Sequence, residues 1–411
     1  MSEQSGWIEL AGQRVRLADV RAHPYRYGRL LADARATRSA VCLCRPARLR
    51  LVTRCGLGGR HHVACWPHEG PNHAPGCAFF HLQPDLSGAG YTSSAIHESA
   101  DGTSIRFHAP LVTRSAQRGL AGEAAATQAG HQRRSVGLLG ILHYLWEVSG
   151  LNGWPGAMRR PQRSWPAVVS ALREHLAVCT INGHPATDVV YVVPPYHPPT
   201  SAQALQRFDA FLERLRTDAP EMRRGLLIAE VKAISPAAHG VRYQLAQQSR
   251  SRQLFLSNAL DTSVRAAFPA ALAAAGQCAG GRRIGLFYLE RSRGGYAVAV
   301  DAALMLTNAS FIPADSSYEV TMTDALQDAG RAFVKPLRYD AGRDAVLPDF
   351  VLTDEPRSYV EVWGLPGRRD YEQRKAAKKA FYQHHAARLL EWTVTEPIPN
   401  LALTQPAPAT T

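Results

Sequence analysis

Residues 346–364 have the sequence Val346-Leu-Pro-Asp349-Phe-Val-Leu352, Thr-Asp-Glu-Pro-Arg357 and Ser358-Tyr-Val-Glu361-Val-Trp-Gly364. The outer two segments are short and apolar and the run between them is polar, so the stretch predicts two adjacent strands joined by a turn. One carboxylate lies in each strand, Asp349 in the first and Glu361 in the second. A carboxylate among apolar residues is costly to bury unless it is paired or bound to a cation. Two of them on neighbouring strands can share one hard divalent ion such as Mg²⁺.

The same patterns predict the elements on either side of this stretch. A helix at 323–330 and a strand at 331–339 precede it, and a helix at 370–388 and a closing strand at 389–394 follow it. The expected order is therefore helix, three strands, helix and strand. Two lysines fall on one face of the second helix and would present their ammonium groups together, Lys375 and Lys378.

This arrangement resembles the core of the PD-(D/E)XK nuclease superfamily over residues 318–396. Pro348-Asp349 is similar to the first motif of that superfamily, and Glu361 supplies the acid of the second. Trp363 stands where the second motif has a lysine, and some members of the superfamily carry this lysine on the following helix. The resemblance implies hydrolysis of phosphodiester bonds with Mg²⁺ or Mn²⁺ as the cofactor.

The resemblance also implies roles for individual residues. Asp349 and Glu361 would hold the metal ion, and Lys378 or Lys375 would orient the attacking water or stabilise the developing charge. An acid of the preceding helix would complete the metal shell, and a lysine of the first strand would contact a backbone phosphate. The candidates for these two roles are Glu319 or Asp324 and Lys335.

A second group of candidate ligands lies in the turn-rich N-terminal part, which contains five of the seven cysteines. Cys42-Leu-Cys44 places two thiols on one side of an extended segment, and His73-Ala-Pro-Gly-Cys77 adds an imidazole and a thiol. These four residues can form a tetrahedral Cys3His zinc site, which would be structural because all four positions are protein ligands. Other residues compete as ligands, namely Cys55, His61, His62, Cys65, His68 and His81.

The charge of the chain favours nucleic acid as a partner. The 411 residues include 47 Lys and Arg against 34 Asp and Glu, a net charge of +13. Only five of the basic residues are lysine, so a GC-rich genome would explain part of the arginine content. Because no apolar run is long enough to span a membrane and no secretory signal is visible, we expect a cytoplasmic protein without membrane association.

The succession of turn-rich, helical and alternating segments predicts a multidomain α+β protein. Its middle part contains two helices joined by a basic, aromatic link, which resembles helical DNA-binding modules but is also explained by core packing. The expected divisions are a zinc-binding module at 1–110, a helical basic region at 111–200, an α/β region of unassigned role at 201–310, a PD-(D/E)XK nuclease-like domain at 311–396 and a disordered tail at 397–411.

The whole chain resembles, more loosely, a family of uncharacterised bacterial proteins encoded on plasmids and integrative conjugative elements. The segments that carry this resemblance are Cys42-Leu-Cys44, Trp66-Pro67 with His73 and Cys77, Leu138 to Trp146, Pro348-Asp349 and Glu361-Val-Trp-Gly364. The resemblance implies a role near mobile DNA. We therefore expect a DNA-associated protein that is either a metal-dependent nuclease, a catalytically inactive DNA-binding accessory protein, or an interaction subunit of a conjugation or element-maintenance complex with partners encoded by the same element.

Overall fold

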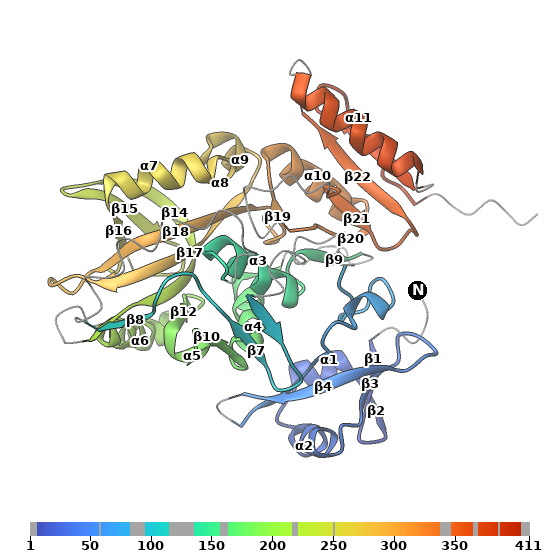
Figure 1. Ribbon diagram of the computed structural model, residues 1–411, viewed down its shortest axis with the longest axis horizontal. Coiled ribbons are helices and arrows are strands. Elements are labelled where there is room, and N and C mark those ends of the chain that lie inside the picture. Colours follow the sequence, from blue (N-terminus) through green and yellow to red (C-terminus); the bar gives the residue numbers. More distant parts are fainter. Residues whose placement is uncertain are drawn as a thin grey trace, which may run out of the picture.

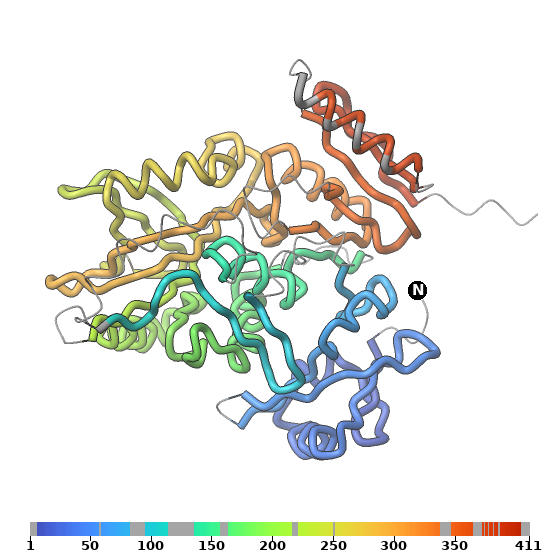
Figure 2. Tube along the Cα trace, in the orientation of Figure 1, coloured from blue at the N-terminus to red at the C-terminus, as the bar shows by residue number. Residues whose placement is uncertain are grey.

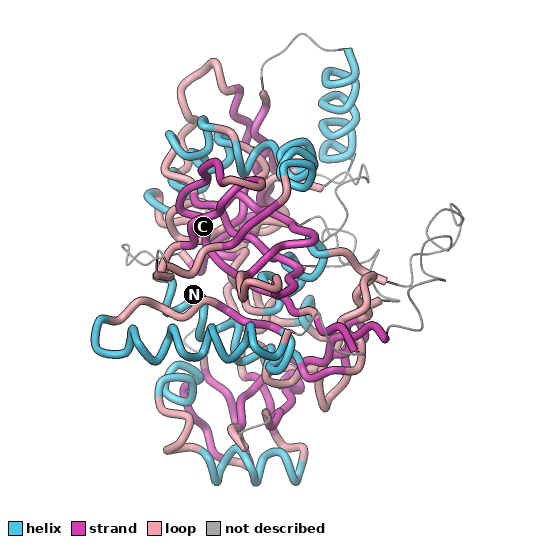
Figure 3. Tube along the Cα trace, turned by 90° about the vertical axis from the view of Figure 1, so that its left-hand side faces the viewer, coloured by secondary structure: helices cyan, strands magenta, loops and turns pink. Residues whose placement is uncertain are grey.

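The computed structural model describes residues 6–56, 59–82, 95–114, 135–156, 163–215, 221–249, 251–337, 347–364, 369–384 and 387–403. The fold mixes α and β structure, as the sequence predicts, and the described strands form five sheets (Figure 1). Figure 2 follows the chain from the N-terminal module in blue to the C-terminal unit in red, and Figure 3 shows helices lying mostly outside a central mass of strands. None of the helices in these residues is both long and apolar enough to cross a membrane.

The N-terminal module is an antiparallel sheet with helices packed against one face. Its strands lie in the order β2 (Gln13–Arg16), β1 (Trp7–Leu10), β3 (Ala40–Cys42), β4 (Leu49–Cys55) and β5 (His61–Cys65). The helices are α1 (Leu17–Ala22) and α2 (Gly28–Thr37), and a 3₁₀ turn, η1 (Gly70–Asn72), follows β5. Because strand side chains alternate between faces, Ile8, Leu10 and Leu51 point toward the helices and form a core with Leu31 of α2.

The next region packs two helices against small sheets. Helix α3 (Leu138–Val148) is buried along most of its length, as its continuous apolar sequence predicts, and α4 (Trp165–Leu176) shares its core. One sheet has the order β11 (His184–Pro185), β10 (Cys179–Ile181), β7 (Thr103–Ile105) and β6 (Ile96–Glu98), and a strand pair joins β13 (Glu221–Arg223) to β8 (Val112–Arg114). The short helix α5 (Ala186–Val189) follows β11.

The central region is built on a sheet whose strands close into a ring. The pairing runs through β14 (Gly225–Ala237), β15 (Gly240–Leu245), β16 (Leu254–Leu256), β18 (Ala297–Thr307) and β17 (Arg282–Arg291) and returns to β14, while β12 (Val190–Val192) and β19 (Pro313–Ala314) add at its edges. β17 and β18 pair as an antiparallel hairpin. The surrounding helices are α6 (Ser201–Arg214), preceded by the 3₁₀ turn η4 (Pro198–Thr200), and α7 (Asn258–Ala267), α8 (Pro269–Leu272) and α9 (Ala274–Cys278).

The C-terminal unit is a sheet between two helices, in the order β23 (Arg388–Thr393), β22 (Ser358–Trp363), β21 (Phe350–Leu352), β20 (Ala332–Val334) and β9 (Gly153–Pro155). β20 to β22 are antiparallel, and α11 (Arg369–His384) connects β22 to the parallel strand β23. Met322 and Leu326 of α10 (Ser317–Asp328) pack on one face of the sheet, and α11 covers the other. The order α10, β20, β21, β22, α11, β23 is the one that the sequence predicts.

Two parts of this unit differ from the sequence prediction. β9 lies within the link that we expected between two helices, and it pairs with β20. Residues 397–403 belong to the predicted disordered tail, but the side chain of Leu401 is buried and its carbonyl accepts a hydrogen bond from Arg331. The predicted disorder therefore does not apply to these residues, and residues 404–411 lie outside the described part of the chain.

Candidate functional site

Cys42, Cys44, His73 and Cys77 form a cluster on the helix-covered side of the N-terminal sheet. Cys42 ends β3, Cys44 follows it, and the turn after η1 brings His73 and Cys77 to them. All four ligand atoms lie within 4.8 Å of one another, and no other group of three or more such residues that could hold a metal ion occurs among the described residues. The competing candidate ligands therefore stay outside the cluster.

The distances in this cluster fit a tetrahedral zinc site. The Sγ atoms of Cys42 and Cys77 are 3.6 Å apart, and Nδ1 of His73 lies 3.4 Å from Sγ of Cys44 and 3.7 Å from Sγ of Cys77. Zn–S bonds of about 2.3 Å give tetrahedral edges of about 3.8 Å, whereas a disulfide requires about 2.05 Å. All seven cysteines are free thiols. The cluster could thus hold a zinc ion, with Nδ1 as the histidine ligand.

The electrostatics of the cluster also fit a cation. Hydrogen bonds from the Cys42 and Cys77 thiols hold the pKa of Cys44 far below its usual value. The hydrogen bond to Cys44, together with burial, raises the pKa of Cys42 to about 12. Hydrogen bonds with Cys42 and Cys44 raise the pKa of Cys77. Without a cation, the three buried sulfurs thus share a single thiolate. A zinc ion would let all three ionise.

The second cluster, which we call the acidic site, begins at the N-terminus of α10. The Ser316 hydroxyl caps this helix by accepting a hydrogen bond from the amide of Glu319, and the Glu319 carboxylate accepts one from the amide of Asp315. This reciprocal pattern is similar to a capping box and fixes the Glu319 side chain in the interior. Lys335, directly after β20, lies 2.8 Å from Glu319 and 2.9 Å from Asp315.

Asp349 and Glu361 are positioned by two neighbouring strands of the C-terminal sheet, β21 and β22. Asp349 directly precedes β21, and its Oδ2 accepts a hydrogen bond of 2.7 Å from the amide of Val362 on β22. Glu361 is only 1% exposed, and its two oxygens accept hydrogen bonds from Lys378 and Tyr382 of α11. Lys378 lies 2.7 Å from Glu361 and 4.0 Å from Asp349, so it contacts both predicted metal ligands.

The two candidate lysines of α11 therefore have different surroundings. Lys378 reaches the carboxylates, whereas the ammonium group of Lys375 lies 5.0 Å from the centre of the Trp363 ring. Trp363 points to the same face of β22 as Glu361, and its indole nitrogen donates to Glu391. The geometry thus brings Lys378, but not Lys375, into the acidic site.

The acidic site carries a surplus of negative charge. Four carboxyl groups face two ammonium groups, namely Asp315, Glu319, Asp349 and Glu361 against Lys335 and Lys378. The formal charge is therefore −2 when all six groups are ionised, which one divalent cation would balance. The three acids Glu319, Asp349 and Glu361 do not meet at one point. Mg²⁺ is commonly held by one or two carboxylates with water and substrate phosphate, and Asp349 and Glu361 offer oxygen atoms of this type.

The pKa shifts in the site reflect this surplus. Burial and the charge of Glu361 raise the pKa of Asp349 to about 6. Burial raises the pKa of Glu319 to about 7, although Lys335 opposes this shift. Burial disfavours the charged form of Lys335, but Asp315 and Glu319 outweigh it and raise the pKa of the lysine. Lys335 therefore stays cationic.

Sequence reasoning assigned Lys335 to a phosphate and offered Asp324 as a metal ligand. In the structure Lys335 is buried and paired with two acids, and Asp324 accepts a hydrogen bond from Asn308. Asp315 and Tyr382 were not predicted as site residues. Two signals in the sequence point to these residues. Asp315 directly precedes the helix cap Ser316, and Tyr382 lies one helical turn beyond Lys378.

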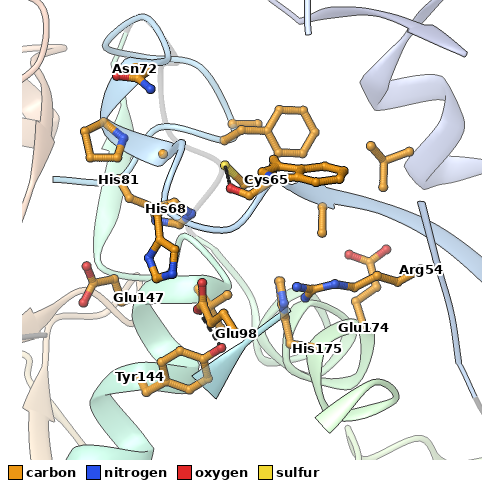
Figure 4. Close-up of a pocket in the computed structure, with 18 of the residues that line it drawn as sticks. Arg54, Cys65, His68, Asn72, His81, Glu98, Tyr144, Glu147, Glu174 and His175 are labelled. Atoms are coloured by element: carbon orange, nitrogen blue, oxygen red, sulfur yellow. Dashed lines mark hydrogen bonds between the residues drawn. The ribbon is translucent and has the colours of Figure 1, made fainter. Parts of the chain in front are cut away.

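A pocket of about 400 Å³ lies between the N-terminal module and helices α3 and α4 (Figure 4). Acids, imidazoles, two arginines and a thiol line it, namely Glu98, Glu147, Glu174, His68, His81, His175, Arg21, Arg54 and Cys65. Burial raises the pKa of Cys65 to about 12 and lowers the pKa of His175 well below its usual value. Both shifts favour the neutral form of these two side chains.

The comparisons with known proteins concern nearly the whole chain. A family model described as "Protein of unknown function (DUF1173)" matches residues 16–395. No curated protein and no solved structure matches the chain. The matched range contains both the Cys3His cluster and the acidic site.

Proposed function

The chain belongs to the DUF1173 family, and we propose that its acidic site hydrolyses phosphodiester bonds of DNA with a divalent cation. The observation that carries the proposal is the position of Lys378, which contacts both Glu361 and Asp349 from a helix that follows β22. Three side chains from separate elements thus converge in a buried site. The order of those elements and the Pro348-Asp349 segment support a PD-(D/E)XK nuclease-like core.

In this proposal each side chain has a defined task. Asp349 and Glu361 would hold Mg²⁺ or Mn²⁺, with Glu319 as an outer carboxylate. When bound, the ion would polarise the scissile phosphate and lower the pKa of a coordinated water. Lys378 would leave its ion pair with Glu361 and stabilise negative charge that develops on the phosphate. Tyr382, which donates to Glu361, would keep that carboxylate oriented.

One observation favours a second candidate, a DNA-binding accessory protein without catalysis. Trp363 occupies the usual lysine position and lies under Lys375, Lys378 and Lys379. In this alternative the Lys378 ion pair with Glu361 is permanent and stabilises the fold. Such a protein would act in the maintenance or transfer of a mobile element, alone or with partners encoded by that element.

The experiment is a cleavage assay with the full chain. Purified protein is incubated with single-stranded, double-stranded and branched DNA in Mg²⁺ or Mn²⁺, beside the variants Asp349→Asn and Glu361→Gln. We expect cleavage that requires the metal ion and is lost in both variants. Cleavage that survives both substitutions would show that the activity comes from another site or a contaminant. Binding without cleavage under every condition would support the accessory protein.

A further inference from the structure

The positive charge of the chain is concentrated in the N-terminal module. Residues 6–82 contain twelve arginines against four acidic residues, a net charge of +8 out of +13 for the chain. Eleven of these arginines are exposed, all except Arg54. The acidic site, in contrast, has no net positive charge to attract a nucleic-acid backbone, even with one divalent cation bound. A protein that cleaves DNA at such a site therefore needs a second, positively charged surface that binds the DNA.

One face of the N-terminal sheet is free of helices over its first strands. Ile8 and Leu10 of β1 point to the core under α2, so Trp7 and Glu9 point to the opposite face. The cross-strand pairs place Arg16 opposite Trp7 and Arg14 opposite Glu9 on that face. Both arginines are exposed, which shows that no described segment covers them.

Arginines on this face are stacked on tryptophan rings. The guanidinium carbons of Arg14 and Arg16 lie 4.6 and 4.7 Å from the centre of the Trp7 ring, and that of Arg50 lies 4.6 Å from the centre of the Trp66 ring. A guanidinium that is already stacked loses less conformational freedom when its N–H edge binds a phosphate. We call this surface the Arg/Trp face, made of Trp7, Arg14, Arg16, Arg48, Arg50 and Trp66.

The four arginines of this face fall into two groups, those with a carboxylate partner and those without one. Arg48 and Arg50 form ion pairs with Glu9 and Glu69. Arg14 and Arg16 have no carboxylate within ion-pair distance in the part of the chain that the structure describes. These two are therefore ready to neutralise phosphates without breaking an existing pair.

We propose that the Arg/Trp face binds the phosphate backbone of DNA and delivers it to the acidic site. The identity of the partner rests on the proposed function, whereas the location of the face rests on charge complementarity and on the stacked arginines. The zinc cluster lies on the other side of the same sheet, at β3, and would stiffen the binding platform. The module and the C-terminal unit both lie toward the same end of the longest axis of the molecule (Figure 1).

The test measures DNA binding apart from cleavage. The full chain carrying Asp349→Asn binds a short fluorescent duplex, followed by anisotropy between about 50 and 200 mM salt. The double variant Arg14→Gln/Arg16→Gln is compared with Arg29→Gln/Arg35→Gln, which removes the same charge from α2. We expect the first pair to lose about tenfold or more in affinity and to reduce the slope of log K against log salt by about two. The Arg29→Gln/Arg35→Gln variant should lose less than about threefold in affinity, because charges that do not contact the DNA are screened by the salt.

Equal losses for the two double variants, or no loss for either, would overturn the proposal. A second assay, hydrolysis of the small diester bis(p-nitrophenyl) phosphate by the chain with intact Asp349, tests the nuclease proposal without DNA binding. The two assays together distinguish failure of the Arg/Trp face from failure of the proposed function. If Arg14→Gln/Arg16→Gln abolishes binding while no variant cleaves any diester, the Arg/Trp face stands and the nuclease proposal fails. If DNA is cleaved with an unchanged KM in that double variant, the nuclease stands and the Arg/Trp face fails.

Discussion

Lys378 and Lys375 lie one turn apart on α11 and have different contacts, so they form a matched pair for testing the acidic site. If Lys378 stabilises charge that develops during hydrolysis, Lys378→Met should lower the single-turnover rate by about 100-fold or more with little change in DNA affinity. Lys375→Met removes the same charge from the same helix and should change the rate less than about threefold, because it contacts no carboxylate of the site. Equal effects of the two substitutions would exclude a specific role for Lys378.

His62 gives a residue-scale prediction for stability. Burial, reinforced by the charges of Arg54 and Arg21, lowers the pKa of His62 to about 4, against about 6.5 in an unfolded chain. Between these values the unfolded chain binds more protons, so the stabilising contribution is fully present above pH 6.5 and is lost as the pH falls toward 4. Between pH 7 and pH 5 the wild type should lose about 2 kcal/mol more than His62→Gln.

The measurement for His62 is urea unfolding of both chains at each pH. The comparison of the two pH profiles removes the contribution of every other titrating group, including the cysteines of the zinc cluster. Parallel profiles for wild type and variant would mean that His62 is protonated equally in the folded and unfolded states. That result would contradict its burial between the N-terminal module and α4.

At the scale of elements, Arg331 holds the C-terminal sheet together. This side chain is fully buried and donates to both carboxylate oxygens of Asp354, to Glu355 and to the carbonyl of Leu401. It thereby joins the start of β20 to the turn after β21 and to the C-terminal segment. Arg331→Met should lower the free energy of unfolding by about 3 kcal/mol, because it leaves Asp354 without its cationic partner and removes one of the two cationic partners of Glu355.

Two further variants sharpen this prediction. Arg331→Lys should recover less than half of the loss, since a lysine cannot reproduce the bidentate contact with Asp354. Arg388→Met removes a more exposed ion pair with Glu355 and should cost about 1 kcal/mol or less. Urea denaturation of the three variants gives the comparison. If Arg388→Met lowers the free energy of unfolding as much as Arg331→Met does, burial does not determine how much these ion pairs stabilise the fold.

The elements also show which features a sequence can predict. β17 and β18 are joined by a short turn that contains Gly294-Gly295, so the pairing of this hairpin is local in the sequence. β9 has three residues, and its partner β20 is far along the chain, so no local pattern indicates a strand there. β15 and β16 pair with each other inside the ring, and tertiary pairing of this kind overrides a weak local pattern.

The same distinction applies to the sites. Cys42 and Cys44 could be grouped from the alternation of one strand, but the choice of His73 over His68 depends on how the turn after η1 folds back. Asp349 and Glu361 could be chosen because each is a carboxylate in an apolar strand. The pairing of Lys335 with Glu319 could not be predicted, since it depends on the packing of α10 against the end of β20.

For the whole molecule, the Cys3His cluster and the acidic site lie in separate sheets, so loss of a zinc ion from the cluster should affect DNA binding and spare hydrolysis at the acidic site. The double variant Cys44→Ala/Cys77→Ala loses two of four ligands, and we expect it to contain less than about a tenth of the zinc of the wild type. Residues 6–82 should then become sensitive to limited proteolysis, because a small module loses much of its stability with its metal. DNA affinity should fall by about tenfold or more, since the Arg/Trp face is built on the same sheet.

Hydrolysis of bis(p-nitrophenyl) phosphate should change less than about threefold in this double variant, because the residues of the acidic site belong to another sheet and core. Cys55→Ala is the matched control: its thiol donates to the carbonyl of Gly56 and lies outside the cluster, so zinc content and DNA affinity should match those of the wild type. Metal analysis, proteolysis and the two assays are made on the same preparations. Full zinc occupancy in Cys44→Ala/Cys77→Ala would refute the assigned ligands. If the double variant loses hydrolysis of the small diester together with its zinc, the two sites belong to one cooperative folding unit. The C-terminal sheet would then depend on the N-terminal module for its activity.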